Sequence, residues 1–498
     1  MGTSWAERLF HEPDVVQYAS ATWTLPIDHG GMTGVLLQRS RLIAHAEGVE
    51  VPILTFDPNL DVAEAESVYR ERGTLDEAVS VRNLWHDLAE RPDTALPRSG
   101  AVVRAESARY AEVDGTTTIV PEGHRRDRVE HRRADDELVM TERRRSDGSV
   151  FVRVYRAVES GMPRVVALLD RAGRPVHVWR GIWDLYRWWL DETLQAPAHV
   201  VVDSKSMVSF FATYRRSGIT VTHLVHGTHL VAEAEDPFAP VNPKRGRLLD
   251  RLEDFDAVAF LTNAQREDVV ARVGEKGNLV VIPNAFRPAP RGEKGQRAVD
   301  HGMVLGGLNA RKRTSHAVLA VGEAAERLGR RLTLDVVGDG ARRPHVEEAA
   351  RSVAGSADVV LHGFVPDGAQ RFGNVSFSML TSTSEGQPLV LLESMAAGCV
   401  PIAYDVRYGP SDIITHGVDG YLVPAGDMDL LAGAIVEFCS LPPERRDEMS
   451  RAARRRAKDF SESRAAKRWR EHFDQLIPRD PPGLLTRFGL HRRRSSKD

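Results

Sequence analysis

Short apolar runs of strand length alternate with segments of helical periodicity along most of this chain, and this pattern restricts the fold more than any other feature. In the C-terminal half the apolar runs lie at 302–306, 332–337, 359–361, 376–380, 400–403 and 420–423. Strands that alternate with helices form βαβ units, in which the strands are parallel. We therefore predict an α/β domain with a parallel sheet, closed by helices near 442–458 and 462–476.

The N-terminal half shows the same alternation, but it is interrupted in the middle. We expect a strand near 15–25, a helix near 32–46, a strand at 51–56, a helix at 182–190 and strands at 200–203, 220–226, 257–261 and 279–282. Between about 101 and 178, segments of period two flank turns at Asp114-Gly115, Ser146-Asp147-Gly148-Ser149 and Ala172-Gly173. Because such turns tolerate positive φ, we predict an inserted antiparallel β-module.

At 498 residues the chain is too long for one core, so we predict two Rossmann-like domains that face each other across a cleft. The N-terminal domain would comprise 1–100 and 181–290, with the β-rich insertion at 101–180 between them. A stretch punctuated by proline and glycine, 288–297, is the expected linker to a C-terminal domain at 291–460, and 461–498 would form a last helix and a basic tail. Ligands of such sheets bind at the carboxyl ends of the strands.

Composition narrows the function classes. The formal net charge of -3 is not that of a globally basic nucleic-acid binder, and no apolar run approaches the roughly 18 residues needed to cross a bilayer. The first residues lack a basic start followed by an apolar core, so no secretory signal is expected. Cys399 and Cys439 have no metal-ligand spacing and are expected to be buried thiols of a reducing compartment, so the cytoplasm is the expected location.

Basic residues are concentrated in three local clusters. They are His124, Arg125, Arg126, Arg128, His131, Arg132 and Arg133; Arg143, Arg144 and Arg145; and Arg487, Arg492, Arg493, Arg494 and Lys497 in the tail. Taken alone, each cluster is more typical of a solvated loop or a frayed terminus than of a binding site.

The most specific motif is the segment 384–401, which reads SEGQPLVLLESMAAGCVP. A buried strand ends just before it, and Pro388 opens a helix whose first amides would point toward the cleft. Glu385 lies in the loop before this helix, and Glu393 lies inside it. Two acids placed in this way can bracket one ligand.

This arrangement resembles the retaining glycosyltransferases of sequence family 4, which have the GT-B fold. The shared features are a Glu, seven residues and a second Glu that leads into Ala-Ala-Gly-x-x-Pro. The following block, YDVRYGPSD at 404–412, resembles the poly(glycerol-phosphate) or poly(ribitol-phosphate) α-glycosyltransferases that decorate teichoic acids, cell-wall polymers. Those enzymes also carry a β-rich insertion in the N-terminal domain, where we predict one here.

The resemblance implies a donor site built mainly from the C-terminal half. Lys312 aligns with the family lysine that neutralises the departing diphosphate, but Gly307 stands where the family has an arginine. Either Arg311 or Arg313 would supply the missing cation, or the site has one fewer. The other implied donor contacts are Glu393 on ribose, Glu385, Gly386 and Gln387 on the sugar, Leu389 and Val390 at the helix start, and Phe364 and Val365 beside the base.

Two positions in the N-terminal half are implied as well. Gly30 and Gly31 match the family's Gly-Gly loop, where backbone can approach a phosphate. His226 fits best the family histidine that faces the transferred sugar, with His223 and His229 as rivals. The His-Gly-Thr-His spacing lacks a carboxylate or cysteine to complete a metal site, so no metal is expected.

The sequence therefore predicts a retaining hexosyltransferase that moves glucose or N-acetylglucosamine from a UDP-sugar to an acceptor hydroxyl, without a metal or other cofactor. An anionic polyol-phosphate polymer would suit the basic clusters as acceptor. The alternatives are a small or lipid-linked acceptor, a non-catalytic protein that binds nucleotide sugars, and a sugar-nucleotide epimerase. No nucleic-acid partner is expected; the β-insertion would support a homo-oligomer, and the basic tail would contact the inner face of the membrane.

Overall fold

The computed structural model describes residues 16–27, 31–98, 117–119, 128–156, 164–231, 233–234, 236–287 and 297–476. Two compact units are distinguished: 1–221 together with 477–498, and 222–476. The expected linker, apart from Arg297, and the basic tail lie outside the described residues. Each unit is described by itself.

The second unit contains a six-stranded sheet in which every neighbouring pair is parallel, in the order β16-β15-β14-β17-β18-β19. Its strands are β14 (Ala298–Leu305), β15 (Leu332–Val337), β16 (Ala357–Gly363), β17 (Val375–Leu380), β18 (Val400–Asp405) and β19 (Tyr421–Pro424). In chain order this is 3-2-1-4-5-6, the arrangement of a doubly wound Rossmann-like sheet. The predicted parallel sheet is therefore present, and all six predicted strands belong to it.

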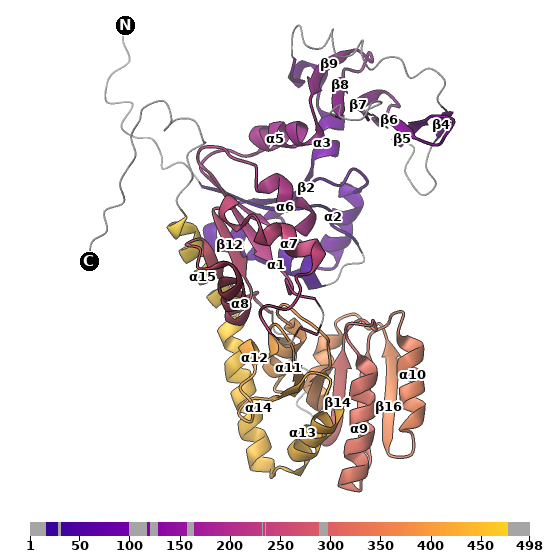
Figure 1. Ribbon diagram of the computed structural model, residues 1–498, viewed down its shortest axis with the longest axis vertical. Helices are drawn as coiled ribbons and strands as arrows, with labels where there is room; N and C mark the ends of the chain where they lie inside the picture. Colours follow the sequence, from indigo (N-terminus) through magenta and orange to yellow (C-terminus); the bar gives the residue numbers. More distant parts are fainter. Residues whose placement is uncertain are drawn as a thin grey trace, which may run out of the picture. The chain divides into compact units, whose positions relative to one another are not determined.

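Helices cover both faces of this sheet because successive strand residues point to opposite sides. Met379 packs in a core with α9 (Thr314–Leu328) and α13 (Met428–Ser440), and the next residue, Leu380, packs in a second core with α11 (Leu389–Ala397) and α14 (Pro443–Ala457). Figure 1 shows α9 and α10 beside β14 and β16. The remaining helices are α10 (Arg343–Ser352), α12 (Pro410–Ile413) and α15 (Glu462–Gln475).

The strand order reverses between β14 and β17. These strands are neighbours in the sheet, although 69 residues lie between the end of β14 and the start of β17. The loops that follow these two strands, 306–313 and 381–388, therefore leave the sheet side by side at its carboxyl edge. Backbone packs tightly here, since a Cβ on Gly338 would clash with Gly306 O and one on Gly340 with Leu308 O. Such a reversal is where doubly wound sheets bind ligands.

The same unit begins with a smaller group of parallel strands. These are β11 (Ile219–Val225), which contributes its first three residues to the first unit, β12 (Ala257–Phe260) and β13 (Leu279–Val281). Two helices lie between them in the chain, α7 (Pro243–Leu249) and α8 (Asn263–Val273). Thr262 caps α8 by accepting a hydrogen bond from the amide of Gln265.

In the first unit, four parallel strands lie in the order β10-β1-β2-β3. Their bounds are β1 (Gln17–Thr22), β2 (Val51–Thr55), β3 (Val79–Asn83) and β10 (Ala198–Val202), and the helices are α1 (Gly31–Glu47), α2 (Val62–Glu71), α3 (Leu84–Glu90), α5 (Ile182–Thr193) and α6 (Val208–Phe211). Phe56 centres an aromatic core with Tyr186, Trp189, Phe210 and Phe211, at ring distances of 5.0 to 6.0 Å. The βαβ pattern predicted for this half is confirmed.

The predicted insertion forms an antiparallel sheet in the order β4-β5-β6-β7-β8-β9. Its strands are β4 (Thr117–Ile119), β5 (Arg128–Arg132), β6 (Leu138–Arg144), β7 (Val150–Tyr155), β8 (Val165–Leu169) and β9 (Pro175–Trp179). Gly148 and Gly173 turn with φ of 85° and 74° between strands, as the sequence predicts, whereas Asp114-Gly115 lies outside the described residues. Figure 1 shows this sheet next to α3 and α5.

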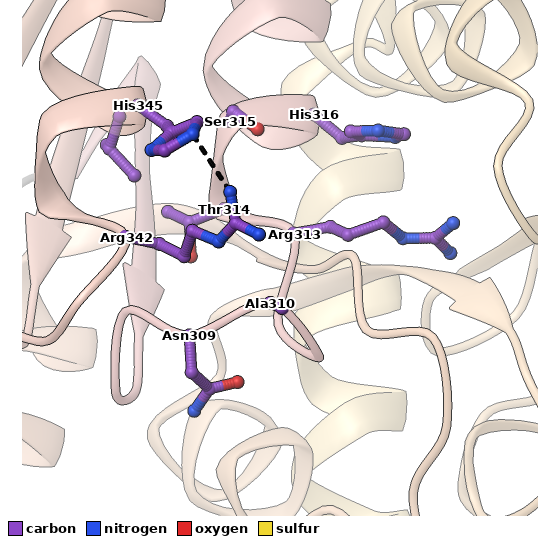
Figure 2. Close-up of a pocket in the computed structure, with 9 residues that line it drawn as sticks. Asn309, Ala310, Arg313, Thr314, Ser315, His316, Arg342 and His345 are labelled. Carbon is purple, nitrogen blue, oxygen red and sulfur yellow. Dashed lines mark hydrogen bonds between the residues drawn. The ribbon is translucent and has the colours of Figure 1, made fainter. Parts of the chain in front are cut away.

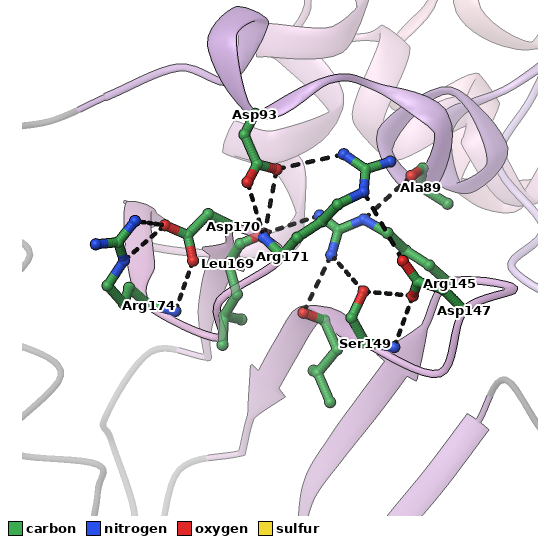
Figure 3. A network of polar contacts seen from close by, with 10 residues as sticks. Ala89, Asp93, Arg145, Asp147, Ser149, Leu169, Asp170, Arg171 and Arg174 are labelled. Carbon is green, nitrogen blue, oxygen red and sulfur yellow. Dashed lines mark hydrogen bonds and ion pairs between the residues drawn. The ribbon is translucent and has the colours of Figure 1, made fainter.

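The interpretation of the insertion arginines as solvated is wrong for two of them. Arg145 is 5% exposed and donates to the carbonyls of Ala89 at 3.1 Å and Leu169 at 2.9 Å (Figure 3). Arg143 is equally buried, donates to Pro58 O at 2.7 Å and lies over the Trp85 ring. These side chains anchor the insertion to its own unit, so they are not available to an anionic polymer.

The other described basic residues of the clusters have acidic neighbours. Arg128 and Arg132 pair with Glu130, Arg144 and His131 lie near Glu142, and Arg133 pairs with Glu137. His124, Arg125, Arg126 and the basic tail lie outside the described residues. Across the described ranges, no helix combines the length and the apolar character required to traverse a bilayer.

Candidate functional site

The two loops at the carboxyl edge of the second unit's large sheet meet through an ion-pair cluster. Lys312 Nζ lies 2.7 Å from Glu385 Oε1, and Arg311 NH1 lies 2.8 Å from Glu385 Oε2. The Glu385 side chain is only 8% exposed, whereas that of Arg311 is 47% exposed. The structure thus brings together three residues that the sequence predicts for the donor site.

The two glutamates of the motif have opposite electrostatic character. Burial would raise the pKa of Glu385, but Lys312 and Arg311 outweigh burial and hold this pKa below its usual value. Burial raises the pKa of Glu393 to about 6, and Lys312 offsets this only in part. Because Lys312 acts on both carboxyls, all three groups share one region. The surroundings of Glu385 therefore favour its charged form, and those of Glu393 disfavour it.

Arg313 is directed elsewhere. It caps α9 with a left-handed backbone, φ of 43°, and its guanidinium donates to the carbonyls of Thr381 and Ser382 at 3.2 Å each. It also lies over the Tyr404 ring and 3.4 Å from Glu233. Of the two arginines left open by the sequence, Arg311 therefore lies with Lys312, and Arg313 stabilises the loop after β17.

A pocket of about 210 Å³ lies at the start of α9, beside the loop that carries Lys312. It is lined by Asn309, Ala310, Arg313, Thr314, Ser315, His316, Arg342, His345 and Val346. Figure 2 shows Arg342 hydrogen-bonded to His345, and the Arg313 side chain extending away from this pair. Apart from Arg313, none of the predicted site residues lines this pocket.

The loop that carries Glu385 is packed against the end of β11. A Cβ on Gly386 would clash with His226 O and approach Gly227, so only glycine permits this contact. Gln387 Oε1 accepts a hydrogen bond from the backbone N–H of Asn284 at 2.7 Å, and Gln387 is 7% exposed. Gln387 thus joins the Pro-Asn turn after β13 to the motif, and its Nε2 is buried without a partner among the described residues.

The three candidate histidines have different surroundings. His226 follows β11, is half-buried and has its backbone against Gly386. His223 is 1% exposed and its ring lies 5.4 Å from that of Phe255. His229 stacks on Tyr408 at 5.7 Å, and burial lowers its pKa to about 4. Of the three, His226 is the one whose backbone packs on the loop of Glu385.

The remaining predicted residues are spread more widely. Leu389 and Val390 form the first turn of α11, and Val365 packs against a small core that includes Cys399. Phe364 follows β16 and is 78% exposed, an unusual state for so large an apolar side chain. Gly31 opens α1 in the first unit, and Gly30 lies outside the described residues.

One arrangement in this region was not foreseen from the sequence. Tyr408 OH donates to Asp268 at 2.7 Å, Arg407 also pairs with Asp268, and the amide of Tyr408 donates to the carbonyl of Glu385 at 3.2 Å. Tyr408 belongs to the quoted block 404–412, which pointed to the segment. No local pattern could link it to Asp268, which lies 140 residues earlier.

Chemically, the cluster can hold an anion and several hydroxyl groups. Lys312 and the exposed Arg311 offer ammonium and guanidinium donors, and guanidinium groups match phosphate oxygens in pairs. The carboxyls of Glu385 and Glu393 can accept hydrogen bonds from hydroxyls. Among the described residues, no group of three or more His, Cys, Asp or Glu is arranged to hold a metal ion.

Part of the chain matches a known protein family and several known proteins. Residues 303–456 match a protein family described as glycosyl transferases group 1. An exopolysaccharide phosphotransferase of Streptomyces coelicolor is 31% identical over 252 residues, which are 48% of this chain and 26% of that protein. The poly(glycerol-phosphate) alpha-glucosyltransferase of Bacillus subtilis is 23% identical over 234 residues, 46% of this chain and 34% of that protein. The chain thus matches only about a quarter to a third of these relatives' length.

Solved structures match over nearly the whole chain. TarM has a TM-score of 0.70 at 15% identity, covering 92% of this chain and 99% of TarM. A TarM mutant of S. aureus, solved with Fondaparinux, alpha-GlcNAc-glycerol and UDP, has a TM-score of 0.68 at 16% identity, covering 92% and 100%. At such identity the likeness shows the fold alone. It confirms the predicted class of two Rossmann-like domains with an antiparallel β-insertion.

Proposed function

We propose that the protein is a retaining hexosyltransferase, because residues 303–456 match the glycosyl transferases group 1 family and the chain has the GT-B fold. Its donor would be a UDP-sugar carrying glucose or N-acetylglucosamine, and its acceptor a hydroxyl of a polyol-phosphate polymer. The observation that carries the proposal is the convergence of Lys312, Glu385 and Glu393 at the point where the strand order of the sheet reverses.

The donor roles follow from charge and position. Lys312 and Arg311 would stabilise the charge that develops on the leaving diphosphate, which is worth most where water is excluded. Glu393, inside α11, would accept hydrogen bonds from the ribose hydroxyls, and Leu389 and Val390 would lie beside the nucleotide at the positive end of this helix. Phe364 and Val365 would form the apolar wall of the base site, which accounts for the exposure of Phe364.

The sugar would lie next to the loop after β17. Glu385 would orient its hydroxyls with the backbone of Gly386, and His226 would face it from the end of β11, since Gly386 and His226 are in backbone contact. Gln387 would act chiefly by holding this loop on Asn284. In front-face transfer the diphosphate oxygen takes the proton of the attacking hydroxyl, so no separate nucleophile is required.

The protein's own cations support a reaction without a metal. Lys312 and Arg311 would supply the positive charge that a divalent ion provides in other transferases. The assay is therefore expected to keep its rate in EDTA. Gly30 and Gly31 would approach the donor or acceptor through their backbone, as the glycine-rich loop of the family implies.

The proposal is supported by relatives that act on related substrates. The curated relative from Bacillus subtilis is named as a glucosyltransferase of poly(glycerol phosphate), and a poly(ribitol-phosphate) alpha-N-acetylglucosaminyltransferase of Staphylococcus aureus is 23% identical over 193 residues. The TarM mutant was solved with UDP. These names support glucose and N-acetylglucosamine as candidate donor sugars, and poly(glycerol phosphate) and poly(ribitol phosphate) as candidate acceptors.

The test is UDP release from UDP-glucose and UDP-N-acetylglucosamine, with and without poly(glycerol phosphate) or poly(ribitol phosphate). We expect release that depends on the polymer and a product with retained anomeric configuration. Release with a small polyol or a lipid-linked acceptor, but not with polymer, would assign the acceptor to that class. Binding of donor without release would indicate a non-catalytic protein, and conversion of donor without acceptor would indicate an epimerase.

A further inference from the structure

Arg245, in the first turn of α7, holds its guanidinium close to the candidate site. A Cβ added to Gly227 would lie 3.2 Å from Arg245 NH2, so the guanidinium lies on the backbone of Gly227. Gly227 also contacts the loop that carries Glu385, since a Cβ added to Gly386 would lie 2.9 Å from Gly227 Cα. Gly227 follows His226, the residue assigned to the transferred sugar. Arg245 therefore contacts Gly227, the chain neighbour of the residue assigned to the reacting centre.

This guanidinium is partly buried and has no acidic partner among the described residues. Burial lowers the pKa of Arg245, and none of the described residues forms an ion pair or side-chain hydrogen bond with it. Nearby arginines differ in this respect: Arg311 pairs with Glu385, Arg313 with Glu233 and Arg407 with Asp268. A guanidinium that no described carboxylate neutralises can bind an anionic ligand, and its planar donors match phosphate oxygens in pairs.

We propose that Arg245 binds a phosphate ester group of the acceptor, which makes it a residue that selects phosphate-bearing polyols over neutral ones. This inference rests on the proposed function, because it takes the region of His226 as the place of sugar transfer. In a polyol-phosphate chain each unit with a free hydroxyl is joined to its neighbours through phosphodiesters. A hydroxyl placed for attack therefore brings a phosphate close to the reacting sugar, where a guanidinium fork can hold two of its oxygens.

The donor diphosphate is the other phosphate group that Arg245 could bind. Its proposed cations, Lys312 and Arg311, follow β14, whereas Arg245 lies beside the end of β11. Two arginines of the β-insertion, Arg143 and Arg145, are buried on carbonyls of their own unit and do not compete for this role. The position of Arg245 beside the end of β11 therefore favours the acceptor phosphate.

The experiment measures binding directly and needs no turnover. Isothermal titration of a synthetic glycerol phosphate oligomer into the UDP-loaded protein is compared for wild type and Arg245→Gln, with a separate titration of UDP. Arg247→Gln, on the exposed face of the same helix, is the matched control. We expect Arg245→Gln to weaken oligomer binding by about tenfold or more, with UDP affinity within about twofold of wild type. Arg247→Gln should match wild type in both titrations.

Three results would overturn the inference: oligomer affinity that is unchanged in Arg245→Gln, UDP affinity that falls by the same factor, or a wild-type protein that does not bind the oligomer. If Arg245→Gln does not fold, Arg245→Lys keeps the charge but not the fork, and we expect it to bind the oligomer severalfold more weakly at wild-type thermal stability. A protein that binds the oligomer through Arg245 but releases no UDP would contradict the proposed function and leave this inference intact.

Discussion

Lys312 Nζ lies 2.7 Å from Glu385 Oε1, so the cation assigned to the leaving diphosphate is neutralised by the acid assigned to the sugar. Arg311 shares the same carboxylate. A diphosphate that enters must compete with Glu385 for both cations or join them as a second anion. The ion pair therefore keeps Lys312 in place before the donor arrives, and it also weakens the attraction for free UDP.

Replacing Glu385 by Gln separates these two effects. The amide keeps the shape of the side chain but frees both cations, so we expect UDP to bind severalfold more tightly while kcat falls by about 100-fold. Steady-state kinetics and calorimetric titration of UDP measure the two changes. Glu347→Gln removes an exposed carboxylate that pairs with Arg343 and should leave both quantities unchanged. A Glu385→Gln enzyme with wild-type kcat would show that Glu385 has no role in the transfer reaction.

Alanine substitutions of the two arginines beside Lys312 should affect different properties, UDP binding for Arg311 and stability for Arg313. Arg311→Ala is expected to weaken UDP binding by about tenfold with little loss of stability, because its side chain is half exposed and points to the same carboxylate as Lys312. Arg313→Ala should instead lower the unfolding midpoint, since its guanidinium holds the carbonyls of Thr381 and Ser382. Calorimetry and thermal unfolding of both variants test this; the reverse pattern would assign the diphosphate to Arg313.

Donor affinity should depend on pH through Glu393. Its folded pKa is raised to about 6, so the carboxylate that accepts ribose hydroxyls is largely present at pH 7 and falls to about one molecule in ten at pH 5. We expect the Kd for UDP-glucose to rise by close to tenfold over this window. UDP-glucose is the suitable probe because its diphosphate, esterified at both ends, does not titrate there.

The matched variant is Glu393→Gln, which cannot lose a proton. It should bind UDP-glucose more weakly than wild type at pH 7 and show an almost flat Kd between pH 7 and pH 5. A wild-type Kd that is itself constant over this window, or a Glu393→Gln variant that keeps the full pH dependence, would show that another group is responsible.

Arg145 should matter for stability and not for the reaction centre itself. Truncation to Ala leaves the buried carbonyls of Ala89 and Leu169 without their donor, which is expected to cost about 2 to 4 kcal/mol of unfolding free energy. Arg174→Ala removes a side chain that is 78% exposed and pairs with Asp170, and should cost below about 1 kcal/mol. Denaturant unfolding compares the two. Equal effects would mean that Arg145 does not anchor the insertion.

The strands were predictable because buried parallel strands are short apolar runs that stand out between helices. The predicted bounds of β15, 332–337, match the structure residue for residue. β3 was not assigned, since VSVRN alternates polar and apolar residues over only five positions. The motif segment 384–401 was likewise predictable as the loop and helix that carry both glutamates, because its order of residues is local.

What could not be predicted depends on residues that are distant in the chain. Gln387 binds the amide of Asn284, Tyr408 binds Asp268, and Arg145 is buried by carbonyls from two other elements. A charge run gives no sign of which arginines will find buried acceptors. The choice between Arg311 and Arg313 was also open, because neighbouring residues in a loop can point in opposite directions.

The most direct measurement is a structure of the protein in complex with UDP. The account predicts ribose hydroxyls within hydrogen-bond distance of Glu393 and a diphosphate oxygen on Lys312, with Arg311 turned toward the phosphates. UDP bound instead in the pocket at the start of α9, with its phosphates on Thr314 and Arg342 and with Lys312 still paired only to Glu385, would contradict it.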